Sequence, residues 1–172
     1  DGGGDFGGNT GWTFNTLNFG DGTGTASSRF FGSGAVTAAS STIALNQTLE
    51  GGAKTFNLTG NTTPLTATGT FTPETSTVAF NSTGTTGTTV PGITYYNLTV
   101  NRASNTFTAG TPLTVGGNLT ITAGTFTAPT GNLNITGNFT NNGAFTHNSG
   151  TVVITVTADG TSLINGSSNT TF

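Results

Sequence analysis

Carboxylates are the side chains of this sequence with the widest chemical use, and the chain has six of them. They are Asp1, Asp5, Asp21, Glu50, Glu74 and Asp159. Two acids held roughly 5 to 10 Å apart can hydrolyse a glycosidic bond, and Glu50 and Glu74 are separated by about one turn of the repeat described below. Each acid is explained equally well as a solubilising residue at a corner. We therefore expect no catalytic residue and no enzyme.

Metal binding has few candidate ligands. Asp1, Asp5 and Asp21 are the only clustered carboxylates, and with carbonyl groups of the nearby Gly-rich loops they offer the hard oxygen ligands that calcium prefers. The chain has no Cys and a single His, His147, which excludes thiolate sites and His clusters. We expect His147 at a surface corner, and we expect no metal and no cofactor.

Two short motifs have simpler explanations than chemistry. The letters of Asp5-Phe6-Gly7 occur in kinases, but none of the companion motifs is present. The loop at residues 20–24 (GDGTG) is Gly-rich, yet it has no Lys and precedes no predicted helix, so a turn explains it better than a phosphate site.

Lys54 is the only lysine of the chain. In exported β proteins a buried Lys can form an isopeptide bond with an Asn side chain when a carboxylate lies nearby, and Glu50 or Glu74 could assist. An ordinary exposed Lys is the alternative. A mass deficit of one ammonia would distinguish the two.

Composition excludes several classes of partner. Only 5% of the 172 residues are charged, against about 25% in ordinary domains. Three Lys and Arg against six Asp and Glu leave no basic patch for nucleic acid. No apolar run approaches the roughly 20 residues of a membrane span. Disorder is an alternative, but the 13 Phe recur at regular intervals, which disordered chains do not show.

A short repeat is the main structural signal. An apolar residue flanked by Thr or Asn, followed by a Gly or Pro turn, recurs every six or seven residues from residue 113 onward. The repeating apolar positions are Leu113, Leu119, Phe126, Leu133, Phe139, Phe145 and Val152. Three cycles make about twenty residues, so Leu113 aligns with Leu133 and Val152, Leu119 with Phe139, and Phe126 with Phe145. This pattern predicts an all-β fold, a β-solenoid (parallel β-helix) with about 20 residues per coil. An antiparallel β-sandwich of the pilin type is the alternative.

The period of two within each strand explains the composition. In segments such as Leu119-Thr120-Ile121, alternate side chains point inward and outward, so apolar residues fill the interior and threonines face water. Gly and Asn suit the corners because they tolerate left-handed backbone angles.

The chain divides into three regions. We expect residues 1–11 to be a flexible Gly-rich arm and residues 12–172 to be a single β domain, with 12–55 as a cap or irregular first coils and 56–172 as the repeat region. A helix over residues 35–45 is an alternative, although its β-branched and Ser content argues against a long one.

Longer similarities occur inside the repeat region. Leu58, Val78, Leu98 and Leu119 fall about twenty residues apart. Residues 56–61 (FNLTGN) are similar to 133–138 (LNITGN), and the segment from Gly69 is similar to that from Gly143, which indicates a second repeat of about 75 residues.

Several segments of the repeat region resemble a known family. GGNLTITAGTF, NLNITGNFTNNGAF, SGTVVI and YYNLTV resemble the β-strand-repeat proteins of bacterial cell surfaces, which are similar to the filamentous regions of adhesins. The resemblance covers residues 56–172, whereas the first 55 residues show none, and the chain is shorter than the usual arrays. It implies export, a structural or adhesive role and no catalysis. Position 1 is not Met, which fits either removal of a leader during secretion or a trimmed fragment.

The ends of the solenoid suggest a function. The segment Asn169–Phe172 stops in mid-repeat, so we expect head-to-tail assembly into an extracellular filament, a homopolymer in which the next subunit completes the open end by β stacking or strand donation. The predicted subunit contacts are Phe6, Trp12, Asn169 and Phe172.

Two further hypotheses stay open. One is a monomeric adhesive or glycan-binding module that uses Trp12, Tyr95 and Tyr96 to bind surface glycans. The other is ice binding, because Thr-X-Thr recurs at residues 70–72, 106–108, 120–122 and 125–127. A flat array needs these pairs on one face, and the spacing places Thr120 and Thr125 on successive sides.

Sequons for N-glycosylation are abundant. They occur at Asn46, Asn57, Asn61, Asn81, Asn97, Asn118, Asn134, Asn138, Asn165 and Asn169. They predict either glycans on a nearly uncharged surface or asparagines at corners.

Overall fold

The computed structural model describes residues 5–155 and 162–172, and this part of the chain contains strands but no helix. Every strand pair in it is parallel, and the strands stack into a β-solenoid of about seven turns whose successive strands are about 20 residues apart. The predicted β-solenoid is confirmed. The antiparallel sandwich is wrong, since it requires antiparallel neighbours. No segment of the described residues forms a helix long and apolar enough to cross a membrane.

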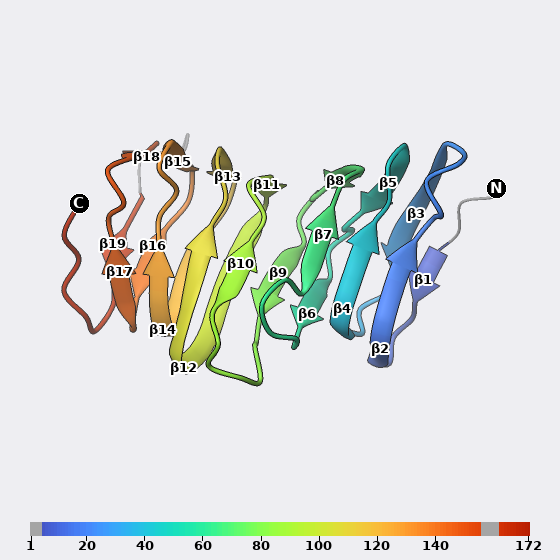
Figure 1. Cartoon of the computed structure of the whole chain (residues 1–172), viewed down its shortest axis with the longest axis horizontal. Helices are drawn as coiled ribbons and strands as arrows, with labels where there is room; N and C mark the ends of the chain where they lie inside the picture. The colour runs from blue at the N-terminus through green and yellow to red at the C-terminus, as the bar shows by residue number, and fades with distance from the viewer. Residues whose placement is uncertain (1–4, 156–161) are drawn as a thin grey trace.

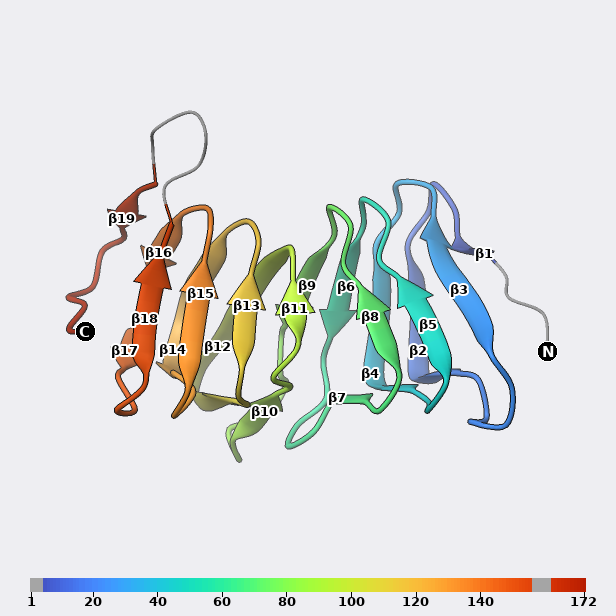
Figure 2. The ribbon, with the colours of Figure 1, turned by 90° about the horizontal axis from the view of Figure 1, so that it is seen from above.

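The strands line three faces, which we number in chain order (Figures 1 and 2). Faces 1 and 2 form one sheet of 11 strands, because four long strands bend at the corner and continue from face 1 into face 2. These long strands are β2 (Trp12–Phe19), β4 (Val36–Ile43), β12 (Asn97–Ala109) and β14 (Leu119–Thr127).

The other strands belong to one face each. Face 1 also contains β6 (Thr55–Leu58), β9 (Thr77–Phe80), β16 (Phe139–Asn141) and β19 (Ile164–Asn165). Face 2 also contains β7 (Leu65–Ala67), β10 (Thr88–Val90) and β17 (Ala144–Thr146). Face 3 contains β1 (Asp5–Gly7), β3 (Ala26–Phe31), β5 (Gln47–Glu50), β8 (Thr70–Thr72), β11 (Thr94–Tyr95), β13 (Leu113–Val115), β15 (Asn132–Ile135) and β18 (Thr151–Ile154).

Face 3 is interrupted halfway along the rod. Its strands form two separate four-stranded sheets, β1-β3-β5-β8 and β11-β13-β15-β18. Across the interruption the rings of Phe71 in β8 and Tyr95 in β11 pack with centroids 6.3 Å apart. Side-chain packing thus replaces the hydrogen-bonded ladder at this point.

The alignments predicted from the short repeat are confirmed in register. The paired residues are Leu113 with Leu133, Leu133 with Val152, Leu119 with Phe139, and Phe126 with Phe145. Leu119, Ile121 and Phe126 are fully buried, while Thr120 between them is partly exposed. Alternating side chains therefore fill the interior with stacked apolar columns, as the strand period requires.

The N-terminal region follows the same architecture. Residues 12–55 contribute β2 to β5, which stack in parallel like the later turns, and the stretch 35–45 forms β4 instead of a helix. Residues 5–7, inside the segment expected to be a flexible arm, form β1 and pair with Arg29–Phe31 of β3. The repeat is weak here only in sequence, because small residues such as Ala38 and Ser41 occupy buried inward positions.

In the series Leu58, Val78, Leu98 and Leu119, the last two pairs are confirmed in register and the first pair is wrong. Val78 pairs with Phe56 and not with Leu58, which pairs with Phe80. Both Phe56 and Leu58 point inward, so a spacing near twenty residues fits either register. The 75-residue repeat does not place its copies on equivalent strands: residues 56–58 lie on face 1, whereas residues 133–135 lie on face 3.

The displacement in the 75-residue repeat is systematic. Thr70–Thr72 is on face 3 and its copy at residues 144–146 is on face 2. Thr77–Phe80 is on face 1 and its copy at residues 151–154 is on face 3. Each second copy is shifted by one face, so the same segment forms strands on two different sides of the rod.

Candidate functional site

A groove of about 600 Å³ opens on the outside of the solenoid at the corner between faces 1 and 2. Its lining residues come from three successive turns: Asn81, Ser82, Thr83, Asn101, Arg102, Ala103 and Ala123. The lining is polar except for the two alanines, and most of these side chains are exposed. It is the best candidate for a binding site in the described part of the chain.

The groove exists because this corner is widened locally. Residues 81–87 connect β9 to β10, whereas only residues 142–143 make the same connection between β16 and β17. In the next turn β12 runs through the corner with a bulge, and its pairing with β14 slips on both sides of Asn101. Ser104 in this bulge has a left-handed φ of 61°. Bulges turn side chains out of the regular alternation, and residues 101–104 are all exposed.

Gly124 in β14 accommodates the bulge from the neighbouring turn. Its φ is +88°, and a Cβ at this position would collide with the backbone carbonyl oxygens of Arg102 and Asn105. Only glycine fits both conditions without strain.

A chain of buried polar side chains supports the walls of the groove. Asn105 donates from Nδ2 to Thr88 Oγ1 at 2.9 Å, and its Oδ1 accepts from the Gly87 backbone N–H at 2.9 Å. Thr88 Oγ1 lies 3.2 Å from Ser82 Oγ, which donates to Asn61 Oδ1 at 2.7 Å. Asn105, Thr88 and Ser82 are all buried. The network ties the 81–87 loop to the bulge, and burial makes it rigid because unpaired polar groups would be costly.

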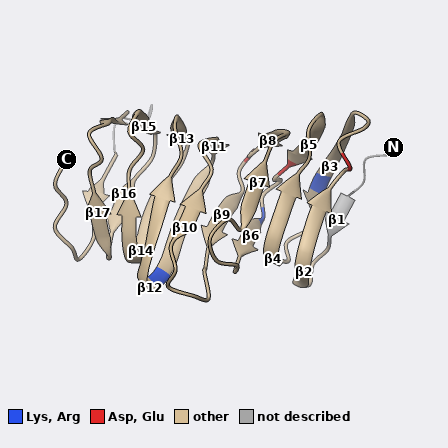
Figure 3. Cartoon of the chain, in the orientation of Figure 1, with Lys and Arg blue, Asp and Glu red and all other residues tan. Residues whose placement is uncertain are grey.

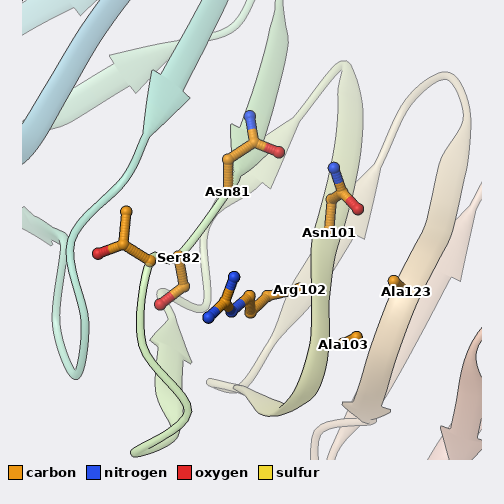
Figure 4. A pocket seen from close by; sticks show the side chains of 7 residues that line it. Asn81, Ser82, Asn101, Arg102, Ala103 and Ala123 are labelled. Atoms are coloured by element: carbon orange, nitrogen blue, oxygen red, sulfur yellow. The ribbon is translucent and has the colours of Figure 1, made fainter.

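Arg102 is the only charged residue that lines the groove. Figure 3 shows one basic position on β12, away from the charged positions near β3 to β8. In Figure 4 the Arg102 side chain extends from β12 toward Ser82, with Asn81 and Asn101 beside it. Among the residues that the structure describes, none forms an ion pair or a hydrogen bond with its guanidinium.

The predicted acidic pair is held by a different arginine. Arg29 on face 3 donates from Nη2 to Glu74 Oε1 at 3.0 Å, and its Nε lies 3.7 Å from Glu50 Oε2. Two carboxylates that share one guanidinium are explained as a surface ion-pair cluster. The structure brings Glu50 and Glu74 together, but as partners of Arg29.

Lys54 is buried, and no carboxylate contacts it among the described residues. Its Nζ donates to the Gly8 carbonyl oxygen at 3.1 Å and to the Gly34 carbonyl oxygen at 2.5 Å, in the turns that precede it. Burial lowers the pKa of the Lys54 ammonium below its usual 10.5. These contacts give Lys54 a structural role at the corner between faces 3 and 1. Glu50 and Glu74, which were expected to assist an isopeptide bond, contact Arg29 and not Lys54.

The remaining predicted site residues are dispersed. Asp21 accepts hydrogen bonds from the backbone N–H and Oγ1 of Thr23, at 2.9 and 2.7 Å, and this turn lowers the pKa of the Asp21 carboxyl. His147 is exposed, and its Nε2 lies 2.6 Å from the Gly150 carbonyl oxygen. Asp1 and Asp159 lie outside the described residues. Within the described ranges, no three His, Asp or Glu side chains come together to hold a metal ion.

The predicted subunit contacts lie at the two ends of the rod. Trp12 begins β2 and is 41% exposed, and Phe6 lies in β1 opposite Phe30. At the other end the ring of Phe172 packs on Phe139 and Phe145, with centroids 5.9 and 5.5 Å apart.

The C-terminal segment is anchored by a buried side chain. Asn141 Nδ2 donates to the Asn169 carbonyl oxygen at 3.2 Å and to Thr170 Oγ1 at 3.0 Å, and the Asn141 carbonyl accepts from the Ser168 N–H. The end of the core that was expected to be open is therefore partly covered by residues 166–172, although Phe172 stays 50% exposed.

The aromatic and Thr candidates divide by face. Tyr95 is fully buried, so its expected role in surface binding is wrong, whereas Tyr96 is 38% exposed.

The Thr pair 120–122 is on face 1 or its corner and the pair 125–127 is on face 2, as the spacing predicted. The pair 106–108 stacks directly on 125–127, but the next turn has Ala144 in place of the first Thr.

None of the ten sequon asparagines is buried. Several of their side-chain amides nevertheless form hydrogen bonds with residues of the neighbouring turns. Asn97 Oδ1 accepts from the Asn118 N–H at 2.9 Å, and Asn118 Oδ1 accepts from the Asn138 N–H at 2.9 Å. Asn81 Nδ2 donates to Asn57 Oδ1 at 3.0 Å. These side chains close the corners of successive turns, which explains why asparagine is frequent there.

The groove is the feature that the sequence reasoning missed. Two signals could have found it: Arg102 is the only Lys or Arg of the region 56–172, and it stands in NRASN, where the alternation of apolar and polar residues fails. No family model, no curated protein and no solved structure matches this chain.

Proposed function

We propose that the protein is a structural segment of an extracellular or cell-surface fibre, and that copies of it stack end to end. The observation that carries the proposal is the strand edge at each end of the solenoid with which no described strand pairs. No described strand pairs with the outer edge of β2 at one end, or with the outer edges of β17 and β18 at the other. Such edges are templates for further strands.

The two ends match each other in direction and in chemistry. All strands run parallel, so β19 and β17 of one copy can continue into β2 of the next without reversal. Exposed apolar side chains lie at both ends: Trp12 at one, and Leu163, Ile164 and Phe172 at the other. A head-to-tail contact between two different ends does not close on itself, so it produces a linear polymer.

The outer surface suits an inert rod. The chain carries a formal net charge of −3 over 172 residues, so little electrostatic repulsion opposes the close approach of copies. Thr and Asn cover the faces, and any glycans at the exposed sequons would add solubility. Export to the cell exterior is part of this proposal.

Electron microscopy and sedimentation velocity of the untagged chain at micromolar concentration test the proposal. We expect thin rods whose length grows with concentration. Trp12→Lys and Ile164→Lys each place a charge at an end and should shorten the rods strongly. The matched control is Tyr96→Lys, which alters a similarly exposed residue in the middle of the rod. A monodisperse monomer, or an equal effect of Tyr96→Lys, would contradict end-to-end stacking.

Ice binding has weaker support. Within the described strands, two successive turns carry the full Thr-X-Thr pair on face 2, at residues 106–108 and 125–127. A thermal-hysteresis measurement on the monomeric end variants tests it directly.

A further inference from the structure

We propose that the groove at the corner between faces 1 and 2 binds an acidic saccharide, a sugar unit with a carboxylate, and that Arg102 recognises this carboxylate. The groove lies along the side of the rod, so the site is separate from the end contacts of the proposed fibre. Four observations lead to this assignment.

The first observation is an unsatisfied cation. Of the three Lys and Arg residues, Arg29 is paired with Glu50 and Glu74, and Lys54 is buried against carbonyl oxygens. Arg102 is exposed in the groove and has no partner among the described residues. The planar fork of a guanidinium fits a carboxylate through two parallel hydrogen bonds. An anionic group is therefore the ligand that this residue selects.

The second observation is the chemistry of the remaining lining. Thr83 and Asn101 are exposed, and no described residue forms a hydrogen bond with either side chain. Asn81 uses its Nδ2 to bind Asn57, which leaves its Oδ1 to accept a hydrogen bond. Amides and hydroxyls of this kind pair with the vicinal hydroxyls of a sugar, each of which both donates and accepts. A bare inorganic anion would leave them unused.

The third observation concerns size. The volume of about 600 Å³ falls within the roughly 300–1,000 Å³ of small-molecule sites, which accommodates one or two sugar rings. No aromatic residue lines the groove. Because stacking on an aromatic ring is absent, we expect weak binding, with a dissociation constant in the millimolar range.

The fourth observation is that the groove is built into the scaffold. Insertions in solenoids gather in loops on one side, which is often the binding side. Here the insertion and the bulge are fixed by the buried network of Asn105, Thr88 and Ser82. A preformed groove loses less conformational entropy when a ligand binds than a mobile loop would.

Titration by NMR or calorimetry tests the proposal with three probes: a hexuronic acid disaccharide, the neutral hexose disaccharide of the same linkage, and inorganic phosphate. We expect the acidic disaccharide to bind at least about tenfold more tightly than the other two, because a hydrogen bond to a charged group contributes about that factor. Arg102→Gln should lose at least about tenfold in affinity for the acidic disaccharide. Arg102→Lys, which keeps the charge without the fork, should lie between the two.

The matched control is Arg29→Gln, which removes the same charge from face 3 and should leave binding unchanged. Circular dichroism verifies the fold of each variant. Absence of binding, equal affinity for phosphate or for the neutral disaccharide, or full affinity in Arg102→Gln would each overturn the assignment. Arg102→Gln should not change rod length in the microscope, so failure of this proposal and failure of the fibre proposal are distinguishable.

Discussion

Tyr95 and Tyr96 are neighbours in the sequence but have different roles in the fold. Its ring is fully buried against Phe80 and Phe71, and its hydroxyl donates to the Pro91 carbonyl oxygen at 3.1 Å. Tyr96 is 38% exposed. Adjacent residues of a strand point to opposite sides, so only one member of the pair can belong to the core.

Tyr95 makes the fold sensitive to alkali. Burial raises the pKa of its phenol well above the ordinary 10.0, so the folded chain keeps this proton at a pH where the unfolded chain loses it. Stability should therefore fall as pH rises above about 10. Tyr95→Phe should cost about 0.5–1.5 kcal/mol at neutral pH through the lost hydrogen bond, and its stability should fall less steeply above pH 10.

Urea unfolding at pH 8 to 11 measures this effect, with Tyr96→Phe as the control that should keep the wild-type slope. Lys54 acts in the opposite direction. Because its folded pKa is lowered, the unfolded chain binds more protons below pH 10.5, and stability from this residue rises as pH approaches that value. The comparison between Tyr95→Phe and wild type removes the Lys54 contribution, which both proteins share. An identical slope in the two proteins would refute the role of Tyr95.

At the scale of elements, the bulge in β12 depends on one buried amide. Asn105 is 2% exposed and satisfies both the Gly87 N–H and Thr88 Oγ1. Asn105→Ala would leave the Gly87 N–H without this partner and Thr88 Oγ1 with only Ser82 Oγ, and we expect a loss of about 1–3 kcal/mol in the free energy of unfolding. Chemical denaturation measures it.

Asn101→Ala is the matched control, since this exposed amide has no partner among the described residues and its loss should stay within about 0.5 kcal/mol. Asn105→Ala should also weaken acidic saccharide binding, because the groove wall would lose its support. Equal stability of the two variants would show that the network does not hold the bulge.

The strands from Leu113 to Val152 could be predicted from sequence because most inward positions carry a large apolar residue and Gly, Asn and Pro recur at the corners. The same reasoning failed for residues 12–55, where Ala and Ser occupy inward positions and weaken the pattern. The groove depends on hydrogen bonds between residues about one turn apart, such as Asn61 with Ser82. No local pattern encodes which of many asparagines makes such a contact.

At the scale of the whole molecule, the interruption of face 3 divides the rod. At this junction the two halves are joined by the ladder of face 1, where β6 pairs with β9, by the isolated bridge between Thr62 and Thr88, and by the packing of Phe71 on Tyr95. Solenoid stability is approximately a sum of terms between neighbouring turns, so this junction should be the weakest. We expect Phe71→Ala to let the two halves open independently, at a cost below the roughly 3–5 kcal/mol of a fully buried Phe.

Native-state hydrogen exchange measures this uncoupling as different opening energies for residues 5–80 and 97–155. The control is Phe145→Ala, a similarly half-buried ring near the C-terminal end, which should loosen only the last turns. Uniform exchange in the Phe71→Ala protein would mean that the ladder alone keeps the rod cooperative.

The one-face displacement of the 75-residue repeat has a geometric consequence. A segment whose length is not a whole number of turns advances the chain along the rod and also rotates it by about one third of a revolution. Successive copies of such a segment would therefore present the same surface residues along a spiral, with three copies needed to return to the starting side. A longer array of this segment would turn its repeated surface residues in three directions around the axis, toward every side of a fibre.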